Sequence, residues 1–181
     1  KRQGEYYGEA HLDDDGINNV PVPIKVQLSI IGDTLNIDFE GTAEQVKSNM
    51  NSPFASSVSS AIACVNSVLT DPDIPFNEGA ERAINVKIPY GSILNPRPRA
   101  PVRARLLPSY RVVNAVMKAL GEAVPERVIA PGFDTTSVCC LSHKLADGYN
   151  IYLEIFGGGF GAGPNYDGCD GDDFDIVITV N

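Results

Sequence analysis

This sequence of 181 residues contains no tryptophan, and histidine and methionine occur only twice each. His11 and His143 alone are too few for a metal site built on three histidines. No apolar run approaches the roughly 20 residues of a membrane span, so we expect no membrane segment. Basic residues are also scarce, with 14 Lys and Arg against 23 Asp and Glu and a net charge of -9. Because a nucleic-acid backbone would repel such a chain, we predict no nucleic-acid partner.

The four cysteines, Cys64, Cys139, Cys140 and Cys169, form no CxxC pair. This excludes the common zinc and thioredoxin-type motifs. So few cysteines in a chain of this length indicate reduced thiols, and we expect a cytoplasmic protein. A Cys140–His143 nucleophile pair is conceivable, although ordinary polar and core roles are favoured for both residues. The chain starts at Lys1 without Met or an apolar leader, which predicts an internal piece of a longer protein.

Alternating apolar and polar residues predict half-buried strands. They occupy residues 20–30, 35–39, 84–88, 151–155 and 174–180, with a weaker pattern at 137–141. Two helices are expected, over 54–69 with Ser52 as cap and over 110–124 with Ser109 as cap. Because short turns join most strands, we predict a single α+β domain over residues 1–181. Its sheet should be mostly antiparallel or mixed, with two principal helices.

One face of the predicted helix 54–69 consists of small residues, mainly serine and alanine. Close packing against a neighbouring sheet is the favoured interpretation, and a helix lining a ligand channel is the alternative. The sequence alone does not decide between the packing and the channel interpretations.

The glycine-rich stretch 156–173 permits three interpretations. Gly157-x-Gly159-x-x-Ala162 fits a relaxed dinucleotide pattern, but no helix can begin well at the following Gly163-Pro164, so the phosphate-binding helix N-terminus is missing. Asp167, Asp170 and Asp172 could form a weak divalent-cation site, although a solvated acidic turn is favoured and EF-hand spacing is absent. The third interpretation is architectural: Gly157, Gly158 and Gly159 let the backbone pass close to another backbone or to a ligand.

A proline-rich segment carries the only basic cluster of this acidic chain: Arg97, Arg99, Arg103 and Arg105. The prolines predict an extended conformation over 96–105. The arginines could pair with the domain's own aspartates, dock a partner subunit, or clamp a carboxylate or phosphate. No complete catalytic set emerges from the motifs alone.

Seven phrases in order resemble the hydantoinase B/oxoprolinase family. They are LDDDG (12–16), IDFEGT (37–42), NMNSP (49–53), IPFNEG (74–79), PYGSILNP (89–96), PERV (125–128) and the stretch from GGG to DG (157–168). The resemblance implies part of a cytosolic B-type subunit in a hetero-oligomer with an actin-like, hydantoinase A-type ATPase. It implies that ATP is used by that partner and that any catalytic metal lies outside this segment. Gly157, Gly158, Gly159 and Asn51 are then candidates for a substrate-binding or close-packed loop.

Such enzymes either open small cyclic amides or carboxylate ketones with ATP, and the phrases favour ring-opening hydrolysis, with ketone carboxylation as the alternative. A hypothesis of another class is a non-catalytic structural or subunit-docking module. If the segment contributes a pocket, helix 54–69 and the loop 157–163 should face one concavity. If it only docks, the arginine segment 97–105 should be exposed and the loop should be buried without a cavity.

Overall fold

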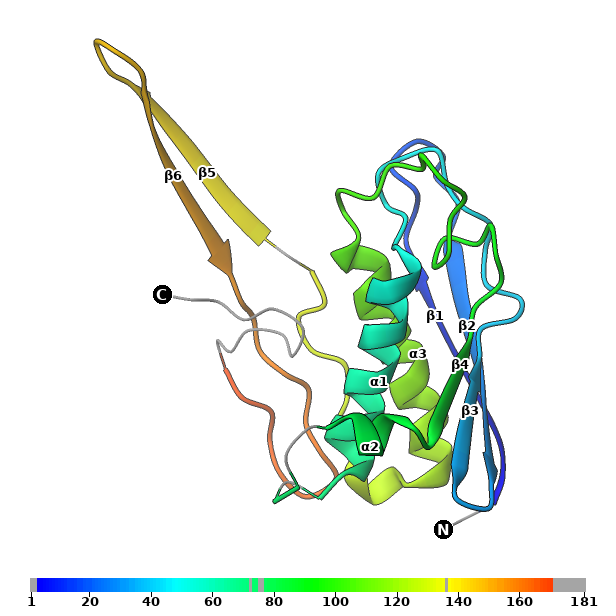
Figure 1. Cartoon of the computed structure of the whole chain (residues 1–181). Helices are drawn as coiled ribbons and strands as arrows, with labels where there is room; N and C mark the ends of the chain where they lie inside the picture. The colour runs from blue at the N-terminus through cyan, green and yellow to red at the C-terminus, as the bar shows by residue number, and fades with distance from the viewer. Residues whose placement is uncertain (1–2, 72, 75–76, 136, 171–181) are drawn as a thin grey trace.

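The computed structural model describes residues 3–71, 73–74, 77–135 and 137–170. The described chain forms a four-stranded sheet, two long helices and a separate β-hairpin. Figure 1 shows the long helices against one face of the larger sheet and the hairpin projecting away from this body. The sheet has the order β1 (Gly4–Leu12), β2 (Val22–Ile31), β3 (Thr34–Asp38) and β4 (Ile84–Lys87). Pairing is antiparallel except between β3 and β4, which are parallel. The predicted α+β fold with a mixed sheet is therefore confirmed.

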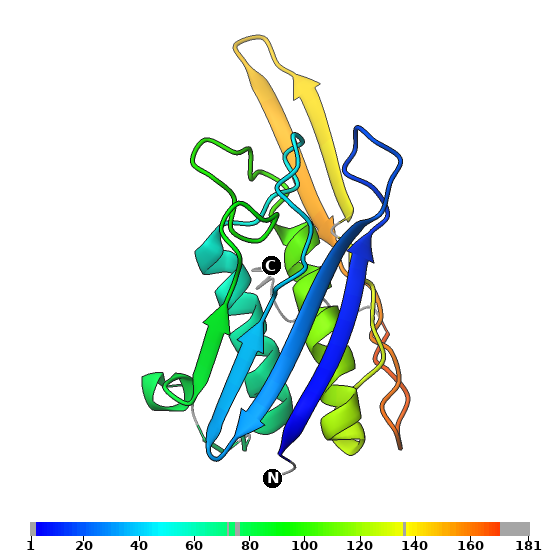
Figure 2. The same ribbon diagram turned by 90° about the vertical axis from the view of Figure 1, so that its right-hand side faces the viewer.

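Alternation along β2 and β3 decides which face of the sheet is buried. Inward residues such as Ile24, Leu28 and Ile37 are almost fully buried, whereas the outward Lys25 is exposed. The two long helices cover this inward face, as Figure 2 shows from the sheet side. The turn between the two strands contains Gly32 at φ 59°, the left-handed region that favours glycine.

The first helix, α1 (Phe54–Leu69), follows Pro53 and has no side-chain cap, so the prediction that Ser52 caps it was wrong. Ser52 is buried, and its backbone N–H donates to the Ile93 carbonyl at 2.8 Å. Of the small residues of α1, Ser57 and Ser60 are buried, whereas Ala55, Ser59 and Ala63 are exposed. The buried Cys64 Sγ lies 3.7 Å from the Val113 carbonyl oxygen of the second long helix, α3. Close packing therefore accounts only for the buried small residues, and the main neighbour of α1 is α3 rather than the predicted sheet.

That second helix, α3 (Leu106–Ala123), begins four residues before the predicted start. Pro108 lies in its first turn, where a proline removes no intrahelical hydrogen bond. Ser109 lies within the helix and donates to the Arg105 carbonyl at 2.9 Å, so the prediction that it caps the helix was wrong. A short helix α2 (Glu78–Glu81) and the 3-10 turn η1 (Pro125–Arg127) complete the helical elements of the described chain.

The projecting hairpin consists of β5 (Ser137–Lys144) and β6 (Tyr149–Phe156), which pair antiparallel and confirm the two predicted strands. The strand predicted over 174–180 lies outside the described residues. Strand β1 was not predicted. Within the described part of the chain, no helix is long and apolar enough to cross a membrane.

Candidate functional site

A polar cavity of about 260 Å³ opens between the end of β1 and the first half of α3. His11 and the loop residues Asp13 and Asp14 line one side, while Arg111 and Asp134 line the other. A histidine and carboxylates around a small open cavity can exchange protons with a bound molecule. This is the cavity that gathers the most ionisable groups among those found in the described residues, and we treat it as the candidate site.

Arg111 and Asp134, which line one side of this cavity, form an ion pair. The Arg111 Nη2 lies 2.9 Å from the Asp134 Oδ2, which also accepts a 2.7 Å hydrogen bond from the Asn114 Nδ2. The Asp134 side chain is only 12% exposed and that of Arg111 21%. The Asp134 Oδ1 is buried without a hydrogen-bond partner among the described residues. Because its charge is already compensated, Arg111 is better suited to fixing the 130–135 segment on α3 than to clamping a substrate carboxylate.

The loop after β1 is held by the buried carboxylate of Asp15. Its Oδ1 accepts from the backbone N–H of Asn18 at 2.6 Å and of Ile17 at 2.9 Å, and its Oδ2 accepts from the Asn18 side chain at 3.0 Å. The backbone hydrogen bond from Asn18, followed by that from Ile17, holds the pKa of Asp15 below its ordinary value, although burial opposes this. The carboxylate therefore fixes the loop that carries Asp13 and Asp14.

The substitution Asp15→Asn should alter how stability depends on pH. A carboxyl group with a lowered folded-state pKa contributes stability that is present above its unfolded pKa, near 3.9. This contribution is lost as the pH falls through the folded value. We expect Asp15→Asn to be less stable than the parent near pH 6, with the gap closing on acidification to about pH 2–3. Urea unfolding midpoints at both pH values test this, and a gap that stays constant with pH contradicts it.

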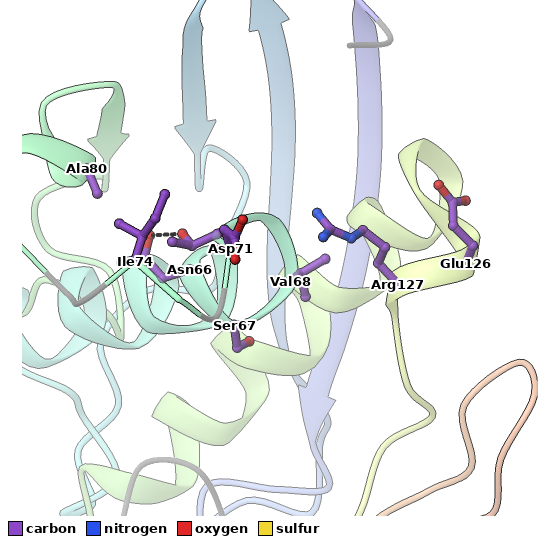
Figure 3. A pocket seen from close by; sticks show the side chains of 9 residues that line it. Asn66, Ser67, Val68, Asp71, Ile74, Ala80, Glu126 and Arg127 are labelled. Carbon is purple, nitrogen blue, oxygen red and sulfur yellow. Dashed lines mark hydrogen bonds between the residues drawn. The ribbon is translucent and has the colours of Figure 1, made fainter.

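A larger cavity of about 540 Å³ lies at the opposite end of the helices (Figure 3). The end of α1 and the turn η1 line it, including Asn66, Asp71 and Arg127. The Arg127 Nη1 donates to the Leu69 carbonyl at 3.4 Å. A neighbouring cavity of about 380 Å³ is bordered mainly by apolar side chains of β3, β4 and α1. These cavities offer space and apolar contact, but few groups suited to proton transfer.

The predicted candidate Asn51 is fully buried, and both polar atoms of its side chain are hydrogen-bonded. Its Oδ1 accepts from the Val46 N–H at 2.9 Å. Its Nδ2 donates to the carbonyls of Val46, Ser48 and Pro101 at 2.9, 3.1 and 3.0 Å. In this arrangement Asn51 ties the 46–51 loop to the segment before α3, and no group of its amide remains for a substrate.

The glycine loop packs against the 130–133 segment. A Cβ at Gly158 would lie 2.1 Å from the Phe133 Cβ, and a Cβ at Gly161 would lie 2.4 Å from the Ala130 carbonyl oxygen. The Phe133 N–H donates to the Gly159 carbonyl at 2.9 Å. Gly157 is exposed at the end of β6. No helix occurs in residues 157–170, so the loop lacks the helix N-terminus that a pyrophosphate site requires.

The structure does not bring the glycine loop and α1 to one concavity in the cavities found. Residues 66–70 of α1 line the large cavities described above, whereas Phe160 of the loop borders a crevice of about 20 Å³ against α3. The condition for a contributed pocket is therefore not met by these cavities. The loop is not buried either, since Gly157 and Ala162 are exposed, so the docking-only condition is met by the exposed arginines alone.

All four arginines of the basic cluster, Arg97, Arg99, Arg103 and Arg105, are exposed. Within the described residues, none of them forms an ion pair with the domain's own carboxylates. Their segment is not extended as predicted: it turns at Arg99, whose φ is 73°, and again directly before α3. Prolines restrict φ and disfavour helix without excluding turns, which explains the difference.

The remaining predicted candidates are the aspartates of the glycine-rich stretch and the Cys140–His143 pair. Asp167 and Asp170 are exposed, and Asp172 lies outside the described residues. The described residues contain no group of three or more His, Cys, Asp or Glu side chains placed to hold a metal ion. Cys140 and His143 lie three positions apart in β5 and point to opposite faces, which contradicts the conceivable nucleophile pair.

Sequence reasoning missed Arg111 and Asp134. Their pairing depends on the fold, because 23 residues separate them and no local motif joins them. The available signal was a charged residue between Tyr110 and Val112, inside the apolar face of the predicted helix.

The fold is shared with two solved enzymes. An ATP-dependent caprolactamase from Pseudomonas jessenii matches 97% of this chain with a TM-score of 0.82 and 26% identity, and the match spans 31% of that enzyme's chain. An acetone carboxylase matches 97% of this chain with a TM-score of 0.73. Its identity of 18% shows a common fold alone, and the match spans 26% of its chain.

Sequence relatives define the family. The model described as Hydantoinase B/oxoprolinase matches residues 1–179, and the chain belongs to this family. The 5-oxoprolinase PfmaA of Pestalotiopsis fici is 36% identical over 159 residues, covering 86% of this chain and 12% of the relative. The 5-oxoprolinase 1 of Arabidopsis thaliana is 30% identical over 164 residues, covering 90% of this chain and 12% of the relative. The chain therefore spans about an eighth of these relatives.

Proposed function

We propose that this chain is an internal domain of the B-type subunit of an ATP-dependent cyclic-amide hydrolase. The observation that carries the proposal is the match to the caprolactamase, which extends over 97% of the chain at 26% identity. The similarity to two 5-oxoprolinases supports the same reaction class. The alternative of a ketone carboxylase is weaker, because the acetone carboxylase shares the fold at only 18% identity.

ATP addresses a specific chemical difficulty in such a reaction. Resonance gives the amide C–N bond partial double-bond character, so an unstrained ring opens slowly. Phosphorylation of the amide oxygen removes this resonance and prepares the carbon for attack by water. We place the nucleotide in a hydantoinase A-type ATPase partner and any divalent metal elsewhere in the B-type subunit. We assign the assembly to the cytoplasm.

The basic cluster suits docking to that partner, because its four arginines are exposed and lack ion pairs among the described residues. Exposed charges of one sign steer association with an acidic surface. If they hold the complex, raising the salt concentration should release the ATPase subunit, because salt screens exposed charges.

Turnover by the full-length subunit together with its ATPase partner tests the reaction. We expect a cyclic amide such as 5-oxoproline, a hydantoin or caprolactam to release ADP and the ring-opened product without bicarbonate. The control omits ATP and should show no opening. ADP release that requires both a ketone and bicarbonate would instead establish the carboxylase alternative.

A further inference from the structure

The β5–β6 hairpin carries the apolar side chains of a buried element, but these side chains are exposed to solvent. Figure 1 shows it projecting from the body, with its tip far from the sheet and helices. Most of its large apolar side chains are exposed, including Ile151 at 68%, Leu153 at 59% and Val138 at 49%. An isolated two-stranded hairpin is only marginally stable in water. The hairpin therefore needs a covering surface.

The strand register divides the hairpin into two different faces. Cross-strand partners lie on the same face, so the pairs Val138–Ile155, Cys140–Leu153, Ser142–Ile151 and Lys144–Tyr149 share one side. We call this set of eight residues the apolar face. The other side carries Ser137, Cys139, Leu141, His143, Asn150, Tyr152, Glu154 and Phe156. Polar and apolar groups are mixed on this second side.

The apolar face has the composition of an interface. Its one charged residue, Lys144, lies at the tip, and it contains no carboxylate. Exposed contiguous apolar surface of this kind marks a contact site in soluble proteins. An apolar rather than charged surface is also typical of a permanent contact, because transient interfaces are more polar.

The relatives are much longer than this chain, and their additional residues indicate what covers the apolar face. The caprolactamase has this fold over 31% of its own chain, so more than two thirds of that enzyme's chain lies beyond the matching region. We propose that the apolar face of the β5–β6 hairpin packs against a part of the same subunit beyond residues 1–181. A permanent contact within one polypeptide also avoids the entropic cost of associating separate molecules. This inference does not depend on whether the subunit acts in hydrolysis or in carboxylation.

A photocrosslinker at two tyrosines of the full-length subunit tests the proposal. Benzoylphenylalanine replaces Tyr149 on the apolar face, or Tyr152 on the other face as the matched control. Both tyrosines belong to β6 and are exposed, at 65% and 52%. We expect the Tyr149 probe to crosslink within one polypeptide, without a gain in mass on a denaturing gel, to a peptide beyond residue 181 or before residue 1. The Tyr152 probe should give severalfold less of that product.

Other products would overturn the inference. A band of twice the subunit mass identifies a second copy, and a band combining both subunits identifies the ATPase. A crosslink confined to residues 1–181, or equal yields from the two probes, also contradicts it. Native Cys140 on the apolar face gives a test without substitution. It should resist alkylation in the folded subunit and react in urea, whereas rapid alkylation of the folded subunit would show that the face is open.

Discussion

Replacing Asn51 by aspartate is expected to lower the free energy of unfolding by about 3–5 kcal/mol. The Asn51 Nδ2 donates to the carbonyls of Val46, Ser48 and Pro101, and the residue is fully buried. A carboxylate in its place offers no donor to these three oxygens and adds an uncompensated negative charge beside them. Equilibrium urea unfolding near pH 7 measures the loss.

The pH dependence separates this electrostatic cause from a simple packing defect. Burial and the surrounding carbonyls raise the folded-state pKa of the introduced carboxyl above its unfolded value. Its destabilising effect is therefore complete at neutral pH and is relieved as the pH falls through the raised folded value. The control Asn49→Asp adds the same charge at an exposed position of the same loop and should stay within about 0.5 kcal/mol of the parent. Equal losses for both variants would contradict the proposed role of Asn51.

Local periodicity predicted the elements whose burial follows a simple pattern. The alternation around Ile24 and Ile37 marks the face covered by α1 and α3, and the hairpin β2–β3 follows from it. The same alternation predicted β6, although its apolar side chains are exposed in this structure. Alternation indicates which face requires cover, but it does not say which segment supplies it.

Other features depended on contacts that no local pattern encodes. Strand β1 escaped prediction because its inward positions include Gly8 and Ala10, which carry little hydrophobic signal. The early start of α3 was missed because Ser109 was taken as its cap, whereas the helix begins at Leu106 and tolerates Pro108 in its first turn. Asn51 was selected from a family resemblance, but its burial among backbone carbonyls became visible only in the folded chain.

Gly8→Ala is the second substitution expected to have a large effect, with a loss of about 3 kcal/mol in the free energy of unfolding. A Cβ at this position of β1 would lie 1.9 Å from the Ala115 carbonyl oxygen and 3.0 Å from the Ala119 backbone nitrogen of α3. Both alanines are fully buried, so the helix has to move away from the sheet to accept one methyl group. In a chain of this size, such a loss corresponds to a fall of roughly 6–12 °C in Tm.

Two further variants test whether the backbone of α3 is what a side chain at position 8 would collide with. Gly4→Ala changes a glycine of the same strand, but the three atoms nearest to its Cβ would all belong to the Tyr6 side chain, the closest at 3.0 Å. Because the end of a side chain gives way more easily than helix backbone, we expect a change below about 0.5 kcal/mol. Ala115→Gly should not rescue Gly8→Ala, because trimming the Ala115 side chain leaves its carbonyl oxygen in place. Rescue by Ala115→Gly, or equal Tm values for Gly4→Ala and Gly8→Ala, would show that β1 and α3 are not in this close backbone contact.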